Sequence, residues 1–185
     1  MFDKEQFIED CKTAIQESSK PQAIREVLTE AISSPNEVIE ILGEPKQAGL
    51  HTVYRSPDLT ILNVVWAPLM TLMPHNHNET WAEIGIYTGR EDNIYWKRSE
   101  NGIEAAGASS LSEKQVLSLG KNIIHSVINP IERLTGALHI YGGDFFADGR
   151  SEWDPETLAE RPYDADRAQK IFRDANIRFF GEPAD

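Results

Sequence analysis

The strongest constraint on the fold is a series of short, apolar, β-branched segments between residues 50 and 145, separated by turns that contain glycine or asparagine. Asn101-Gly102 is a strong signal for a two-residue β-hairpin. No segment of helical period and length interrupts the series, which disfavours a parallel sheet built from βαβ units. The pattern predicts a β-sandwich or small barrel. Its strands are predicted at Thr60–Trp66, Trp81–Tyr87, Asn93–Arg98, Val116–Leu119, Ile123–Ile128 and Leu134–Tyr141.

Residues 2–45, which precede the strands, have the pattern of helices. They contain three sets of apolar residues at helical spacing. The first set includes Cys11, the second begins after Pro21, which suits a first helical turn, and the third is closed by Gly43. We expect this segment to pack on the outside of the barrel.

Residues 146–185, which follow the strands, are polar and rich in proline. A helix is predicted there over Ala165–Ala175, with Asp164 as its N-cap. The whole chain is predicted to form a single domain, 1–185, made of a helical segment at 1–45, a barrel at 50–145 and a C-terminal extension at 146–185.

Length and charge limit the class of protein. The chain has 185 residues, enough for one domain with a sizeable core. Its net charge of −12 argues against nucleic acid or an anionic membrane as a partner, because both bind basic surfaces. No apolar segment reaches the length of a membrane span, and the N-terminus lacks the residue order of a signal peptide. The single Cys11 cannot form an internal disulfide. We therefore expect a cytoplasmic protein, as a monomer or a homo-oligomer.

Four of the five histidines lie between positions 75 and 139. His75 and His77 are two residues apart, which on a strand directs both side chains to one face. Neutral imidazole is the commonest metal ligand, and a catalytic metal needs about three protein ligands. His125 and His139 are the other histidines of the strand region, and the third ligand must come from such a distant strand. A single histidine is more often a core or surface residue, but this combination favours a metal site.

Two short motifs resemble those of the cupin superfamily. Pro74-His75-Asn76-His77, followed by a strand that ends at Gly89, resembles the H-x-H motif with its closing glycine. The segment from His125 to Asn129 resembles the H-x-x-x-N motif. The resemblance implies a mainly β fold, a cupin double-stranded β-helix (jelly-roll) barrel with an N-terminal helical segment. It also implies the metal ligands His75, His77 and His125.

One departure from the general cupin pattern points to a branch of the superfamily. Many cupins have a glutamate shortly after the H-x-H motif, where this chain has Trp81 and Ala82. Loss of that glutamate marks the thiol dioxygenases, similar to cysteine dioxygenase and 3-mercaptopropionate dioxygenase, which bind iron through three histidines. Glu83 is one position too late and has the opposite facing to Ala82. We favour an outer barrel surface for Glu83 over a place in the pocket or a role as a fourth ligand.

Further residues are similar to this branch. The segment His77–Glu91 resembles the bacterial pattern H-x-x-T-W-A-x-x-G-x-x-x-G-R-E. His139 and Tyr141 resemble the S-x-H-x-Y element, whose histidine and tyrosine line the iron pocket without binding the iron. The resemblance therefore implies catalytic roles for His139 and Tyr141. Ala137 replaces the serine of this element, which removes one hydroxyl from its hydrogen bonds.

The resemblance implies an iron(II)-dependent thiol dioxygenase that oxidises a small thiol, such as cysteine or 3-mercaptopropionate, to its sulfinate with O2. Arg55 resembles the arginine that holds the substrate carboxylate, and Trp81 is expected at the substrate site. Ala82 stands where the animal enzymes have a cysteine cross-linked to the tyrosine, so that cross-link is not expected.

Two other functions stay open. A cupin oxygenase that cleaves a carbon–carbon bond would use the same three histidines without needing an arginine. A non-catalytic cupin would bind a metal or a small molecule without taking up oxygen. The sequence does not choose among the thiols, and imidazole also accepts nickel, manganese or zinc in place of iron.

Overall fold

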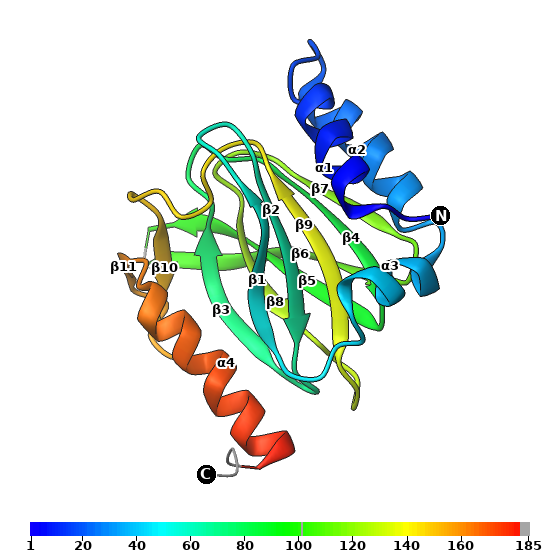
Figure 1. The fold of residues 1–185 in the computed structure, drawn as a ribbon. Coiled ribbons are helices and arrows are strands. Elements are labelled where there is room, and N and C mark those ends of the chain that lie inside the picture. The colour runs from blue at the N-terminus through cyan, green and yellow to red at the C-terminus, as the bar shows by residue number, and fades with distance from the viewer. Residues whose placement is uncertain (101, 182–185) are drawn as a thin grey trace.

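The computed structural model describes residues 1–100 and 102–181, and two antiparallel β-sheets face each other at its centre (Figure 1). The first sheet has five strands in the order β1-β2-β9-β4-β7. Their bounds are β1 Gly49–Arg55, β2 Thr60–Trp66, β4 Ala82–Thr88, β7 Val116–Leu119 and β9 Thr135–Tyr141.

The second sheet has six strands in the order β11-β10-β3-β8-β5-β6. Their bounds are β3 Thr71–Asn76, β5 Arg90–Ser99, β6 Gly102–Ser112, β8 Ile124–Ile128, β10 Ser151–Trp153 and β11 Glu160–Pro162. The chain crosses repeatedly from one sheet to the other, so the sheets form a double-stranded β-helix. The predicted mainly β jelly roll with an N-terminal helical segment is confirmed.

The first sheet is buried on both faces. Along β2, Leu62 and Val64 point into the apolar cluster between the sheets, whereas Ile61 points into a second cluster on the outer face. On β9 the same alternation sends Tyr141 inward and Ile140 outward. A strand buried on both faces has a nearly continuous apolar sequence, which is why these strands were predictable.

Three helices cover the outer face of the five-stranded sheet (Figure 1). α2 lies so close to β4 that a Cβ atom on Gly85 would be 2.9 Å from the side chain of Leu28. Cys11 of α1 is fully buried in this outer cluster, and burial raises the pKa of its thiol to about 12, as expected for a packing residue. The helices have the predicted order and span α1 Lys4–Ala14, α2 Lys20–Ala31 and α3 Pro35–Leu42.

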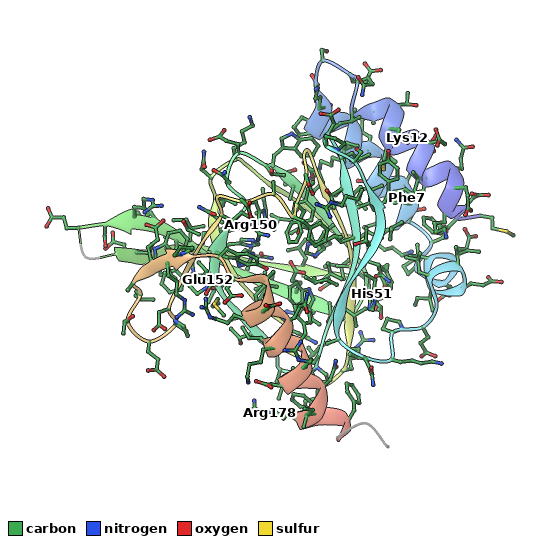
Figure 2. All side chains as sticks on the ribbon, turned by 60° about the vertical axis from the view of Figure 1, so that its left-hand side comes forward. Phe7, Lys12, His51, Arg150, Glu152 and Arg178 are labelled. Atoms are coloured by element: carbon green, nitrogen blue, oxygen red, sulfur yellow. The ribbon has the colours of Figure 1, made fainter. Side chains whose placement is uncertain are left out.

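The C-terminal extension adds β10 and β11, which the sequence did not predict. β10 pairs with β3, where Glu152 lies opposite His75. The side chain of Glu152 is fully buried, accepts a 2.8 Å hydrogen bond from Arg161 and also pairs with Arg167 of the following helix. Glu152 and Arg150 both lie on the segment that leads to this helix, far from α1 (Figure 2). This buried carboxylate therefore links β10 to β11 and to the helix that follows.

The last helix, α4, spans Ala165–Phe180 and closes one side of the barrel (Figure 1). Asp164 caps it as predicted, but the helix continues past the predicted end at Ala175. Phe172 of α4 stacks on Trp66 of β2, with ring centroids 5.4 Å apart, so the helix contributes to the core between the sheets.

The predicted strands correspond to β2, β4, β5, β7, β8 and β9. In the predicted hairpin, Ser99 of β5 pairs with Gly102 of β6, while Asn101 lies outside the described residues. Within the described part of the chain, no helix is both long and apolar enough to cross a membrane.

Candidate metal centre

A β-bulge in β3 turns His75 into the barrel. β3 pairs with β8, and the register shifts between Leu72 and His75, so Met73-Pro74 add one residue to β3. Proline lacks an amide hydrogen, and such a bulge accommodates it. In a regular strand, Leu72 and His75 would face opposite ways because they are three residues apart. With the bulge, both line the same cavity.

Three histidines converge in this cavity. His75 lies directly opposite His125 in the β3–β8 ladder, and His77 is the first residue after β3. One nitrogen from each ring lies within 4.8 Å of the other two, and Nε2 of His77 is 3.2 Å from Nε2 of His125. Three imidazole nitrogens this close together can share one divalent metal ion.

Hydrogen bonds on the far side of two rings select the free nitrogen. Nδ1 of His75 lies 2.9 Å from the carbonyl oxygen of Met73, and Nδ1 of His125 lies 2.7 Å from Oδ1 of Asn93. Both oxygens can only accept, so each Nδ1 carries the proton and each Nε2 keeps a lone pair. These two side chains are thus held in the tautomer that binds a metal through Nε2.

Burial keeps the three imidazoles neutral. Burial lowers the pKa of His75 to about 3, with a further contribution from the positive charge of Arg150 and an opposing one from the Met73 carbonyl. The pKa values of His77 and His125 are also held well below the usual range, again mainly by burial. Neutral imidazole is the metal-binding form, so the three side chains fit a divalent ion.

His139 lines the same cavity but is not one of the three converging histidines. Its Nδ1 lies 3.1 Å from the hydroxyl of Tyr141. Its Nε2 lies 3.4 Å from Oε2 of Glu91, outside hydrogen-bonding geometry. Burial raises the pKa of Tyr141, so its hydroxyl keeps its proton. The structure thus places His139 and Tyr141 beside the three converging histidines.

Arg150, in the loop between β9 and β10, also lines the cavity. Its place beside the histidines was not predicted from the sequence. Nε donates to the carbonyl oxygen of Asn76 at 2.9 Å, and the guanidinium lies between the rings of Phe145 and Tyr163, 4.3 and 4.0 Å from their centroids. Nη2 is buried and has no hydrogen-bond partner among the described residues. A buried arginine with a free N–H group is suited to bind an anion. Only its basic character in a loop signalled it in the sequence.

Arg55 does not reach the cavity. It lies at the end of β1, where its Nε and Nη2 each donate to the carboxylate of Asp144 at 2.8 Å. Its side chain is 49% exposed and lies over the ring of Phe146. The prediction that Arg55 holds a substrate carboxylate is therefore corrected: Asp144 already occupies its guanidinium, and Arg150 is the arginine next to the histidines.

Two side chains near the start of β4 also lie outside the cavity. Trp81, predicted at the substrate site, packs against Gly142, where a Cβ atom would collide with the indole. Glu83 faces α2: it accepts a 2.7 Å hydrogen bond from Ser118 and lies 3.6 Å from Arg25. Glu83 is therefore outside the histidine cluster: it lies on the outer side of the barrel, as favoured, but is buried there rather than on the surface.

The cavity is small and adjoins a larger hollow. Its volume is about 20 Å³, roughly the space of one water molecule. A vestibule of about 770 Å³ lies beside it, lined in part by the loop before β10 and by the start of α4. The two hollows share the side chains that separate them: Leu50, Phe145, Arg150, Tyr163 and Ala168.

No protein-family model matches the sequence, and no curated protein sequence matches it. Solved structures with a similar fold include a protein with a double-stranded β-helix domain from Klebsiella pneumoniae, at 10% identity over 62% of this chain and 87% of that one, with a TM-score of 0.49. A protein from Bacillus halodurans has 14% identity over 57% and 77%, with a TM-score of 0.50. An RmlC-like cupin from Methanocaldococcus jannaschii has 10% identity over 56% and 86%, with a TM-score of 0.47.

At these identities the likeness concerns the fold alone. The strand order and the two facing sheets of this chain form a double-stranded β-helix. Within that fold, the chain carries a cluster of three buried histidines that can hold a metal ion.

Proposed function

We propose that this chain is an iron(II)-dependent thiol dioxygenase that converts a small thiol carboxylate to its sulfinate with O2. The observation that carries the proposal is the meeting of three neutral imidazoles with a buried arginine that has a free N–H group. His75, His77 and His125 would hold the metal. No carboxylate among the described residues completes this ligand set, as in the thiol dioxygenases that the sequence resembles.

A bound iron(II) ion would supply neighbouring positions for a thiolate and for dioxygen, and would couple the oxidation of one to the reduction of the other. The overall reaction is R–SH + O2 → R–SO2H. Sulfur loses four electrons, dioxygen gains four, and both oxygen atoms end on sulfur. The thiol proton is released when the sulfinic acid ionises.

Arg150 supports a carboxylate as the second group of the substrate. The aromatic rings on either side fix the plane of its guanidinium, and Nη2 is free to donate. Burial lowers the pKa of Arg150, but arginine stays protonated at neutral pH, so the positive charge is retained. A charge-assisted hydrogen bond to a carboxylate would satisfy this buried donor.

The cavity lining favours a substrate without an amino group. Apart from the four histidines, Tyr141, Tyr163 and Arg150, the described residues around the cavity are apolar, and none is an aspartate or glutamate. A substrate ammonium would lose its hydration there without gaining an anionic partner. We therefore propose 3-mercaptopropionate, rather than cysteine or cysteamine, as the type of substrate.

His139 and Tyr141 would act on the substrate side of the metal. The Tyr141 ring lies edge-on to His77, with centroids 5.2 Å apart, and its hydroxyl is linked to His139. Because burial keeps the phenol protonated, its O–H group can donate and its oxygen can accept a hydrogen bond. With the O–H group directed to His139, the Tyr141 oxygen can accept a hydrogen bond on the substrate side, and the two residues would orient the thiol.

The test is oxygen consumption by the iron(II)-loaded protein with 3-mercaptopropionate, cysteine and cysteamine, together with measurement of each sulfinate. We expect the largest kcat/KM for 3-mercaptopropionate and one O2 consumed per sulfinate formed. The matched control is the His125→Ala variant treated with iron in the same way, which we expect to be inactive. Absence of uptake with every thiol, in protein shown to contain iron, would refute the proposal and favour a non-catalytic metal-binding cupin.

A further inference from the structure

Glu91 is a carboxylate buried inside the barrel, with no exposed surface. It lies on β5, and its side chain accepts hydrogen bonds from Nε1 of Trp66 at 2.7 Å and from Nδ2 of Asn93 at 2.9 Å. Its Oε2 is also 3.4 Å from Nε2 of His139. No lysine or arginine pairs with it among the described residues. A buried charge held only by such donors is costly unless every contact is satisfied.

On one side, Glu91 is linked through Asn93 to His125, a proposed metal ligand. Because Nδ2 of Asn93 donates to Glu91, the other end of the amide, Oδ1, faces Nδ1 of His125 at 2.7 Å. That oxygen can only accept, so the proton of His125 lies on Nδ1. The lone pair of Nε2 then points toward His77 and the converging nitrogens. Glu91 thereby selects the metal-binding tautomer of His125 through the orientation of one amide.

On its other side, Glu91 lies next to His139, which in turn contacts the hydroxyl of Tyr141. With a carboxylate oxygen near Nε2 of His139, the favoured tautomer has its proton on Nε2. Nδ1 is then an acceptor, and the Tyr141 hydroxyl donates to it. Ala137 precedes His139 on the same face and offers no hydroxyl, so Glu91 is the charged group that sets the orientation of this pair.

We propose that Glu91 is a positioning residue that fixes the tautomers of His125 and His139 together. The inference about His125 rests on the metal site of the proposed function. The inference about His139 also rests on the proposed thiol oxidation. Neither inference requires a particular thiol. Histidine ligands commonly depend on such a partner on the far nitrogen, and its loss reduces metal affinity by roughly 10–100-fold.

The test is Glu91→Gln, which keeps the shape but replaces one carboxylate oxygen by an amide NH2. If the NH2 group faces Asn93, two donors meet, the Asn93 amide turns over and the His125 proton moves to Nε2. If the NH2 group faced Trp66, it would meet the indole N–H, which can only donate, so the orientation toward Asn93 is favoured. Glu91→Gln is therefore expected to invert the tautomer of His125.

Imidazole ¹⁵N NMR of the metal-free protein measures these tautomers without metal or thiol. In the wild type we expect the proton on Nδ1 of His125 and on Nε2 of His139. In Glu91→Gln, inversion at His125 should weaken cobalt(II) affinity by roughly 10–100-fold. The His139 tautomer should be unchanged, because the amide oxygen of the glutamine still faces Trp66 and His139.

The matched control is Glu83→Gln, a second buried glutamate whose partners, Ser118 and Arg25, lie outside the barrel. It should change neither tautomer nor cobalt(II) affinity. Other tautomers in the wild type, or an unchanged His125 tautomer in Glu91→Gln, would overturn the proposal. Because NMR needs no turnover, a failure of thiol oxidation would not be mistaken for a failure of this inference.

Discussion

For three of the four inward histidines, the atom that faces Nδ1 indicates the role of the side chain. A peptide carbonyl faces Nδ1 of His75 and an amide oxygen faces that of His125, and both leave Nε2 with a lone pair. A tyrosine hydroxyl faces Nδ1 of His139, and a hydroxyl can donate or accept. Spacing alone could suggest a metal site but could not separate His125 from His139. The resemblance to a known motif made that separation.

Removing these two side chains should have different consequences. We expect His125→Ala to lose iron binding, because two imidazoles remain where a catalytic metal needs about three ligands. We expect His139→Ala to retain iron and to turn over more slowly, since His139 lies outside the converging set. Iron content after desalting and kcat measure the two effects. Loss of iron in His139→Ala with retention in His125→Ala would show that the third ligand is His139.

Arg150 should set the affinity for the substrate carboxylate. Replacing it with glutamine removes a charge-assisted hydrogen bond worth about 1.5–3 kcal/mol, so kcat/KM for 3-mercaptopropionate should fall by roughly 10–150-fold. Oxidation of cysteamine, which lacks a carboxylate, should be much less affected. The control is Arg55→Gln, because Arg55 pairs with Asp144 outside the cavity. Equal losses for the two thiols in Arg150→Gln would contradict a carboxylate-binding role.

At the scale of elements, the strands that could be predicted are those with a nearly continuous apolar sequence, which itself indicates burial on both faces. β2 and β9 are apolar on both faces, so their sequences predict strands without knowledge of their neighbours. β10 and β11 have only three residues each, mostly polar, and exist because β3 offers a pairing edge. No local pattern encodes such a contact. The same reason explains why Arg150, in the loop before β10, was missed.

Polar residues of β5 show a second limit. Glu91 and Asn93 alternate along β5 in a way that is typical of a solvent-exposed face. In the structure this face is the barrel interior, and both side chains are fully buried. Which face of a strand is inside depends on the opposing sheet, and that information is absent from the segment itself.

The packing of α4 gives a prediction at this scale. Phe172 is 5% exposed and stacks on Trp66, so Phe172→Ala should leave a void between helix and sheet and destabilise the protein by about 3 kcal/mol. Phe180 lies on the same helix but is 47% exposed, and Phe180→Ala should change stability by less than about 0.5 kcal/mol. Urea unfolding measures both. Equal effects would mean that α4 does not depend on its contact with the barrel.

At the scale of the whole molecule, the N-terminal and C-terminal segments pack against different parts of the barrel. α1–α3 cover the outer face of the five-stranded sheet and leave the interior untouched. The C-terminal extension instead adds β10 and β11 to the six-stranded sheet and supplies Arg150, Tyr163, Ala168 and Phe172 to the cavity. The three histidines that could hold a metal come from the barrel, whereas one part of the cavity wall comes from the extension. Substrate selection should therefore change more readily with the extension than metal binding does.

Enclosing three neutral histidines in the barrel also makes global stability depend on pH. In the unfolded chain a histidine takes up a proton near pH 6.5. In the folded, metal-free protein the pKa of His75 is about 3 and those of His77 and His125 are well below 6.5, so these rings stay neutral. The unfolded state therefore binds more protons below pH 6.5, and stability must fall as pH falls from there toward the folded pKa values.

Each such histidine should contribute a slope of about 1.4 kcal/mol per pH unit below pH 6.5. Urea unfolding of the metal-free protein between pH 7.5 and 5 measures it above the range in which most carboxylates titrate. His75→Gln should reduce the slope by up to one histidine's share, whereas His51→Gln should not, because His51 is exposed on β1. If His75→Gln leaves the slope unchanged, the His75 ring is not held neutral in the folded state, and the barrel does not present a ready metal ligand at that position.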